Sequence, residues 1–161
     1  MDMETGSVTS LQGNMHSKPI TALHCPEAYA NNEFLVHVFM TASQDGLVKF
    51  WDRRSNTSVA HVNTGGGRIP FYSVGTNNNL IAAGTNEDLL FWDIHKLQKP
   101  IGRFDESHSE DVTAIKFDQD APHMMISCAI DNVLNMFNLQ NDGGNARLVE
   151  EDLIDGAYSS T

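Results

Sequence analysis

The stretch FMTASQDGLVKFWD, residues 39–52, has the pattern of a β-hairpin. Two β-rich runs, 36–43 and 47–51, flank the polar turn Gln44-Asp45-Gly46, and aspartate and glycine are typical of tight turns. The stretch ends on an aromatic residue and an acid, Trp51-Asp52. These features predict two adjacent antiparallel strands in this part of the chain.

The same pattern occurs twice more along the chain. LIAAGTNEDLLFWD spans residues 80–93 and MISCAIDNVLNMFN spans residues 125–138. Trp51 and Trp92 are 41 residues apart, and Trp92 and Phe137 are 45 apart. Periods of about 40–45 residues are typical of the four-stranded blades of β-propellers. We therefore expect an all-β fold with about three four-stranded blades.

Strand signals between the turns fit this organisation. The expected strands are 21–25, 36–43, 47–51 and 59–63, then 69–74, 80–83, 88–92 and 101–104, and finally 112–117, 124–128, 133–137 and 146–150. Segments 65–67, 77–79 and 141–145 have the composition of loops. No long window has a helical period.

Composition disfavours several classes of protein. The 161 residues carry a net charge of −11, so neither nucleic acid nor an anionic membrane surface is an expected partner. No apolar run approaches the ~20 residues that span a bilayer, and the N-terminus lacks the apolar core of a secretory signal. Two cysteines, Cys25 and Cys128, make no disulfide scaffold. We expect an intracellular protein, cytoplasmic or nuclear.

The run SQDGLVKFWD, residues 43–52, resembles the repeat end of the WD-repeat β-propeller family. The resemblance covers about residues 1–153 and implies WD repeats at 13–65 and 108–153, with a degenerate repeat at 66–107. In that family an acid, a Thr-Gly turn and an outer strand follow the repeat-end tryptophan, as in residues 2–12. We therefore expect residues 1–12 to be the orphan outer strand of a missing preceding blade and 154–161 to be a tail.

This organisation predicts an incomplete propeller. A truncated isoform, an incomplete gene model and a domain fragment all remain open as its origin.

The resemblance also assigns a polar tetrad to each blade, made of a histidine, a hydroxyl residue, an aspartate and a tryptophan. The first repeat has all four members: His16, Thr41, Asp45 and Trp51. The third has His108, Ser127 and Asp131, with Phe137 in place of tryptophan. In the second, Trp92 stands alone, with Ala82 and Asn86 aligned to the hydroxyl and acid positions. We expect these residues to be structural, since a buried polar chain is stabilising when every member is satisfied.

A catalytic triad is the alternative interpretation of His108, Ser127 and Asp131. The equivalent set in the first repeat argues against it, because an active site is not expected to recur in each repeat. The chain has no GxSxG, P-loop, GxGxxG or HExxH motif. Its seven histidines have no repeated ligand spacing, so we expect no metal and no cofactor. A convergent pocket with perturbed acids would favour an enzyme.

Trp51-Asp52-Arg53-Arg54 matches the WDxR motif of WD-repeat proteins that dock on the adaptor of cullin-type ubiquitin ligases. The resemblance implies that Asp52 and Arg54 make this contact. The alternative is a surface arginine paired with a nearby carboxylate. We therefore expect a non-catalytic scaffold for protein–protein interaction, with a ligase substrate receptor as the alternative and a propeller enzyme as the less favoured one. The partner, the pathway and the full number of blades are not specified by the sequence.

Overall fold

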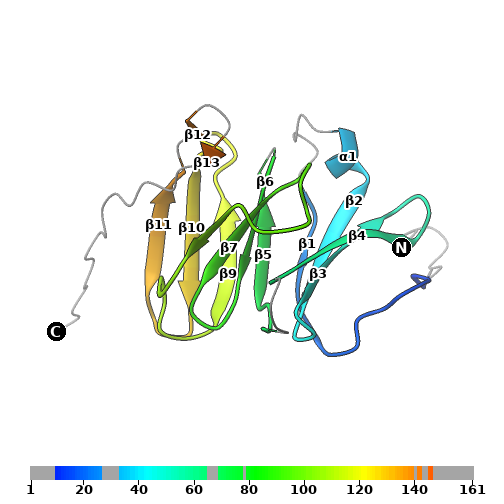
Figure 1. Cartoon of the computed structure of the whole chain (residues 1–161), viewed down its shortest axis with the longest axis horizontal. Helices are drawn as coiled ribbons and strands as arrows, with labels where there is room; N and C mark the ends of the chain where they lie inside the picture. The colour runs from blue at the N-terminus through cyan, green and yellow to red at the C-terminus, as the bar shows by residue number, and fades with distance from the viewer. Residues whose placement is uncertain are drawn as a thin grey trace, which may run out of the picture.

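Three antiparallel β-sheets stand side by side in the computed structural model, which describes residues 10–26, 33–64, 69–77, 79–139, 141–142 and 145–146 (Figure 1). Blade 1 consists of β1 (Ile20–His24), β2 (Val38–Ser43), β3 (Leu47–Asp52) and β4 (Thr57–Asn63), in that spatial order. The short helix α1 (Glu33–Val36) precedes β2. This sheet lies within the proposed repeat 13–65.

Blade 2 has the same order, β5 (Ser73–Thr76), β6 (Leu80–Gly84), β7 (Leu89–Asp93) and β8 (Gly102–Phe104). Blade 3 contains β9 (Val112–Phe117), β10 (Met124–Ala129) and β11 (Leu134–Asn138), with β10 in the middle. The prediction of an all-β, incomplete propeller-type fold is confirmed, although the described part of blade 3 has three strands rather than four.

Several sequence-based boundaries differ from the structure. The strand expected at 36–43 begins at Val38, because Val36 belongs to α1. The first strand of blade 2 was expected at 69–74 but begins at Ser73. Pro70 explains the delay, because proline lacks the N–H that a strand donates and restricts the residue before it. Segment 141–145 was expected to be a loop, but Asn141–Asp142 (β12) pairs with Asn145–Ala146 (β13). Of the strand predicted at 146–150, residues 147–150 lie outside the described part, as do residues 1–9 and the tail 154–161.

Each blade has two faces, because side chains alternate along a strand. In blade 1, Trp51 lies opposite Phe39, and Phe50 lies opposite Met40 on the other side. We call the side that carries Trp51, Trp92 or Phe137 the tryptophan face and the opposite side the plain face. The plain face of one blade packs on the tryptophan face of the next.

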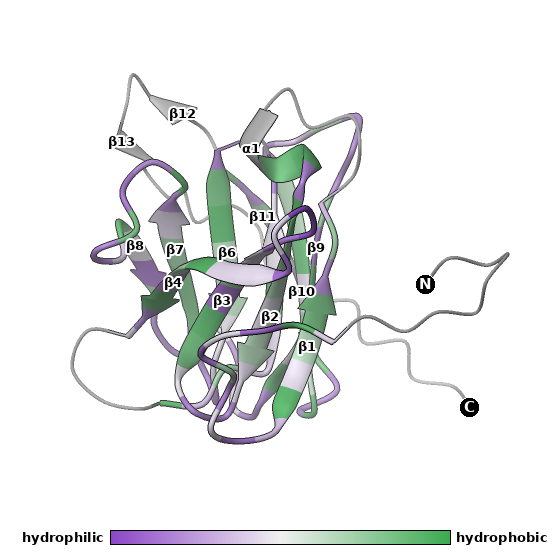
Figure 2. Ribbon diagram, turned by 90° about the vertical axis from the view of Figure 1, so that its right-hand side faces the viewer, coloured by the Kyte–Doolittle hydropathy of each residue, from purple (hydrophilic) through white to green (hydrophobic). Residues whose placement is uncertain are grey.

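Two apolar layers result from this packing. The first lies between blades 1 and 2 and includes Met40, Phe50, Ile81 and Trp92. The second lies between blades 2 and 3 and includes Phe91, with Met125 and Phe137. Figure 2 shows the strands coloured mainly as hydrophobic and the connecting loops mainly as hydrophilic. The fold is therefore a row of sheets held together by face-to-face apolar contact.

Candidate functional site

Four polar side chains of blade 1 form one connected hydrogen-bond chain. The indole N–H of Trp51 donates to Thr41 Oγ1 at 2.7 Å, and this oxygen lies 2.8 Å from His16 Nε2. His16 Nδ1 lies 2.9 Å from Asp45 Oδ2. The indole only donates and the carboxylate only accepts, so the imidazole tautomer with its proton on Nδ1 fits the chain: Nδ1–H donates to Asp45, and Nε2 accepts a hydrogen bond from the Thr41 hydroxyl. Every member then has a partner.

Asp45 closes the turn that the sequence predicted between β2 and β3. Its carboxylate accepts hydrogen bonds from the backbone N–H groups of Ser17 and Leu47, at 3.0 and 3.1 Å. Burial raises the pKa of Asp45, but these hydrogen bonds and the contact with His16 outweigh it, and the pKa lies below its ordinary value. The carboxylate therefore ties the segment before β1 to the β2–β3 turn in its ionised form.

Blade 3 repeats this arrangement without the tryptophan. His108 Nε2 lies 2.7 Å from Ser127 Oγ, and His108 Nδ1 lies 3.1 Å from Asp131 Oδ2. Backbone N–H groups of Ser109 and Val133 donate to Asp131. Burial raises the pKa of Asp131, yet these hydrogen bonds lower it overall. The ring of Phe137 has no N–H to donate, so the polar chain ends at the Ser127 hydroxyl.

In blade 2 the position aligned to the hydroxyl from the sequence was wrong by one residue. Trp92 lies opposite Ile81, and Leu90 lies opposite Ala83. Ala83, not Ala82, therefore shares the tryptophan face, while Ala82 lies on the plain face. The reason is turn length: residues 85–88 connect β6 to β7, against residues 44–46 in blade 1. The indole N–H of Trp92 is buried without a hydrogen-bond partner in the part of the chain that the structure describes.

Lys49 is a buried polar residue that the sequence analysis missed. It lies on the tryptophan face of blade 1, and only 3% of its surface is exposed. Its ammonium donates to the backbone carbonyls of Asn14 and Met15. Together with His16, this contact fastens segment 10–18 over that face. The signal in the sequence was the spacing of two residues between Lys49 and Trp51, which places both side chains on one face of a strand.

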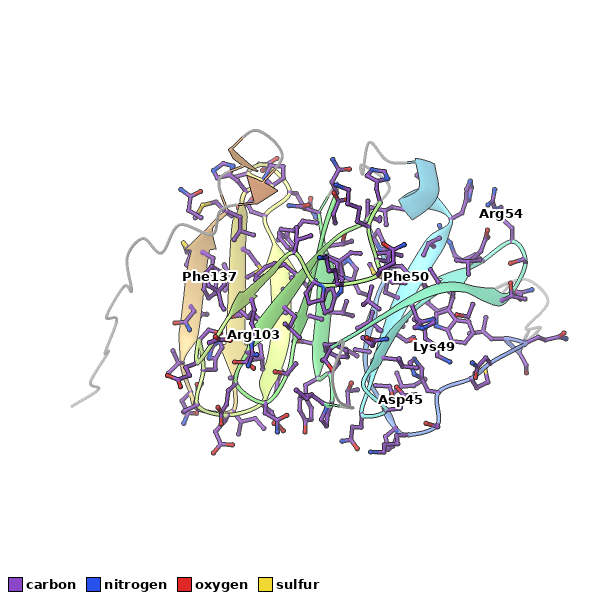
Figure 3. The ribbon with its side chains drawn as sticks, viewed as in Figure 1. Asp45, Lys49, Phe50, Arg54, Arg103 and Phe137 are labelled. Carbon is purple, nitrogen blue, oxygen red and sulfur yellow. The ribbon has the colours of Figure 1, made fainter. Side chains whose placement is uncertain are left out.

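Asp52 of the WDxR motif ends β3, and Arg53 and Arg54 lie in the turn before β4, at the opposite end of blade 1 from Asp45 (Figure 3). Arg54 donates from Nη2 to Asp52 Oδ2 at 2.7 Å and from Nε to Asp52 Oδ1 at 3.1 Å. The Arg54 side chain is 67% exposed. Hydrogen bonds from Arg54 hold the pKa of Asp52 well below its ordinary value, and Asp52 raises that of Arg54.

Arg53 has a different role from Arg54. Its guanidinium donates to the backbone carbonyl of Val36, at the end of α1. The two neighbouring arginines thus belong to separate contacts. Because Arg54 engages Asp52 through one edge of its planar guanidinium, the opposite edge is left for an outside acceptor.

A surface pocket of about 480 Å³ lies beside the blade 3 network. Its lining includes His108, Asp131, Glu87 and Glu106, but Ser127 is not part of it. Ser127 is 1% exposed, and its hydroxyl points to His108 within the blade. The residues that resemble a triad therefore do not present a nucleophile to this pocket.

The described residues include no group of three or more histidine, cysteine or acidic side chains that could hold a metal ion. Within the same part of the chain, no helix is long and apolar enough to cross a membrane.

The repeat pattern of this chain matches a known protein family. The family model described as "WD domain, G-beta repeat" matches residues 5–52 and 98–138, more than half of the chain. The chain belongs to the WD40 repeat family. This family assignment agrees with the three blades and with the two polar networks at equivalent positions.

Individual WD-repeat proteins are similar over most of the chain. "WD repeat-containing protein GTS1" of Arabidopsis thaliana is 33% identical over 108 residues, which are 66% of this chain and 27% of that protein. "WD repeat-containing protein 89 homolog" of Dictyostelium discoideum is 27% identical over 104 residues, 65% of this chain and 28% of that protein. The order of regular and degenerate repeats here also resembles proteins of the latter name. The chain spans about a quarter of the length of these two relatives.

Two further proteins are similar to this chain, one in sequence and one in fold. "Histone acetyltransferase type B subunit 2" of Candida glabrata is 28% identical over 124 residues, 74% of this chain and 28% of that protein. Among solved structures, the computationally designed Ika8 protein superposes with a TM-score of 0.58 and 21% identity, covering 76% of this chain and 34% of that one. The structural match supports the fold alone.

Proposed function

We propose that this chain is a non-catalytic WD40 scaffold that binds other proteins without a cofactor. The observation that carries the proposal is the repetition of one buried polar network in two blades. His16, Thr41 and Asp45 in blade 1 have the same mutual contacts as His108, Ser127 and Asp131 in blade 3. Residues that recur at equivalent places and satisfy one another support the blades rather than a reaction.

The burial of Ser127 argues against the enzyme alternative. A nucleophile must reach the substrate, and a general base must lie within reach of the proton that it takes. The described pocket touches His108 and Asp131 but not the serine. Binding is left to exposed loops, such as the one that contains Asp105 and Glu106, which rigid blades present to a partner.

A binding experiment tests the scaffold proposal. We expect the purified chain to capture a protein partner, and the purified partner to bind wild type and Ser127→Ala comparably, provided that the variant folds. Glu106→Lys, which reverses a charge in the exposed loop, tests whether that loop makes the contact. A hydrolytic activity of the wild type that Ser127→Ala abolishes would contradict the non-catalytic assignment.

Docking on the adaptor of a cullin-type ubiquitin ligase is the second candidate function. The exposed Asp52–Arg54 pair favours it, because the guanidinium is oriented by Asp52 while one of its edges stays open. A carboxylate on the adaptor could accept a charge-assisted hydrogen bond there. On this proposal the chain is the substrate receptor, and Asp52 positions Arg54.

The neighbouring arginine supplies a matched control. In a pull-down with purified adaptor, Arg54→Ala should reduce recovery several-fold, whereas Arg53→Ala should leave it near the wild-type level. Equal recovery with wild type and Arg54→Ala, or no recovery with either, would remove the ligase candidate and leave the scaffold proposal intact.

An intracellular location, cytoplasmic or nuclear, also belongs to this proposal. Its support is that Cys25 and Cys128 are both free thiols, a state that reducing compartments maintain.

A further inference from the structure

The turn between β3 and β4 carries an exposed serine directly after the two arginines. Arg53, Arg54 and Ser55 are all exposed. No other two of the chain's 10 lysines and arginines are adjacent in sequence, and the net charge is −11. The turn lies at the edge of blade 1 rather than on a face that packs against another blade (Figure 3). It is therefore a local cationic site that presents a hydroxyl group.

The Ser55 hydroxyl is in contact with another hydroxyl at the surface. Ser55 Oγ lies 2.8 Å from Thr57 Oγ1, and this contact is exposed. Ser58, the next serine along the chain, is half-buried in β4, and its hydroxyl donates to the carbonyl of Ala60. Water replaces a lost hydrogen bond at an exposed site, so the Ser55 hydroxyl can leave its contact at little cost. Ser55 rather than Ser58 is thus available for modification.

Arg54 is placed to receive an anion on its neighbour. Its guanidinium is oriented by Asp52 through one edge, whereas the guanidinium of Arg53 is directed to the carbonyl of Val36. A phosphate on Ser55 would offer three acceptor oxygens to the open edge of Arg54. Residues 52–54 carry a formal charge of +1. A phosphate of about −1.5 to −2 at pH 7 would make this turn negative.

We propose that Ser55 is a phosphorylation site and that its phosphate pairs with Arg54 and closes the open guanidinium edge. Ser55 Oγ attacks the terminal phosphorus of a nucleoside triphosphate held by a protein kinase. A new Oγ–P bond forms, the bond from that phosphorus to the bridging oxygen breaks, and the nucleoside diphosphate leaves. The hydroxyl proton passes to a base of the kinase. The kinase is one whose acidic groups recognise arginine on the N-terminal side of the serine.

The modification regulates the docking proposed for Arg54, and in this respect it rests on the ligase candidate. A phosphate on Ser55 occupies the guanidinium edge that the adaptor carboxylate needs. It also repels that carboxylate, because both groups are anionic. Docking is therefore expected of the unmodified chain and not of the phosphorylated chain.

Phosphorylation of the whole chain in vitro tests the site. The chain is incubated with MgATP and a purified kinase that selects arginine at the second position before serine, and the phosphate is mapped by mass spectrometry. Wild type and Ser58→Ala should carry the phosphate on Ser55, whereas Ser55→Ala should carry none in this turn. A wild-type chain without phosphate on Ser55, or with as much on Ser58, overturns the proposal.

Phosphorus NMR of the phosphorylated chain tests the contact with Arg54. A guanidinium partner favours the dianion, so the second pKa of the phosphate should be lower in the wild type than in Arg54→Ala. Arg53→Ala is the matched control and should leave this pKa close to the wild-type value. The same pKa in wild type and Arg54→Ala would overturn the pairing.

A pull-down with purified adaptor separates this proposal from the docking itself. Phosphorylation should reduce recovery of the wild type several-fold, and kinase-treated Ser55→Ala should bind like the unmodified chain. Equal recovery of phosphorylated and unmodified wild type would overturn the closure of the Arg54 edge. No recovery of the unmodified chain would remove the ligase candidate alone, since mass spectrometry and the NMR titration decide the site and its contact independently.

Discussion

Trp51 and Trp92 occupy equivalent places in neighbouring blades but differ in their hydrogen bonds. Trp51 donates to Thr41, whereas the N–H of Trp92 is buried without an acceptor among the described residues. Trp51→Phe should lower the free energy of unfolding by about 1–3 kcal/mol more than Trp92→Phe does, because only the first leaves a buried hydroxyl without its donor. Both changes remove similar volume, so their difference isolates the hydrogen bond.

Urea denaturation of the two variants measures this difference. Equal destabilisation would mean that the indole–hydroxyl bond adds nothing beyond packing. A larger loss for Trp92→Phe would contradict the assignment of Trp92 as the unpartnered indole.

Ala83 and Ala82 test the register of blade 2. Ala83 shares a face with Trp92, so Ala83→Ser would place a hydroxyl near the unpartnered indole N–H. Ala82→Ser would bury a hydroxyl in the apolar layer beside Phe91. We expect Ala83→Ser to be more stable than Ala82→Ser by about 1 kcal/mol or more, since a buried hydroxyl without a partner is costly. The reverse order of thermal midpoints would support the sequence alignment over the observed register.

Asp45 and Asp131 should make the fold sensitive to acid. The pKa of each lies below the ordinary value of 3.8, so the unfolded chain binds their protons at a higher pH than the folded chain does. Their contribution to stability is present above about pH 4 and is lost as the pH falls through the folded pKa.

Asp45→Asn should therefore be less stable than wild type at neutral pH and should lose less further stability below about pH 4. Urea midpoints measured over this range check the prediction. An unchanged acid dependence in both Asp45→Asn and Asp131→Asn would show that other carboxyl groups cause it.

At the scale of elements, two glycines set how closely blades 2 and 3 approach. A Cβ on Gly84 would lie 2.5 Å from Ser73 Oγ and 2.7 Å from Val112 Cβ, whereas one on Gly75 would lie 3.2 Å from Ile115 Cγ2. Gly84→Ala should destabilise the chain by about 1–3 kcal/mol, as overpacking does. Gly75→Ala should cost less, because its nearest contacts, Ile115 Cγ2 at 3.2 Å and the Ile115 carbonyl oxygen at 3.3 Å, are tight but need a shift of only a few tenths of an ångström.

Chemical denaturation again compares the two variants. Comparable stability of Gly84→Ala and wild type would mean that the strands of blades 2 and 3 separate at little cost, in conflict with the close contact described here.

For the whole molecule, blade 2 is the only described blade with neighbours on both faces. Stability in repeat arrays depends on contacts between adjacent repeats. Amide hydrogen exchange should therefore be slowest in β6 and β7 and faster in β2 and β10, although all four are flanked by strands on both sides. Exchange followed by mass spectrometry checks this order. Uniform protection across the blades would indicate that the chain unfolds as one unit.

The repeats could be predicted from the sequence, and so could the four-membered hydrogen-bond set of blade 1 and the three-membered set of blade 3. The turn Gln44-Asp45-Gly46, the alternation in 47–51 and the spacing of 41 and 45 residues are properties of contiguous residues. Short-range physics acts on them directly, through turn geometry and period-two burial. The resemblance to the WD-repeat family then assigned His16, Thr41, Asp45 and Trp51 to one polar tetrad.

Only the tertiary structure decided the pairing register of blade 2, the burial of Lys49 and the exposure of Leu134. Pairing register depends on which residues of two strands meet across their turn. The turn 85–88 of blade 2 is one residue longer than the turn 44–46 of blade 1, so Ala83 rather than Ala82 shares a face with Trp92. Burial depends on what lies across the sheet, and Leu134 and Val48 have the same apolar character with different neighbours. A sequence specifies which face of a strand is apolar, whereas contacts between remote segments decide whether that face is covered.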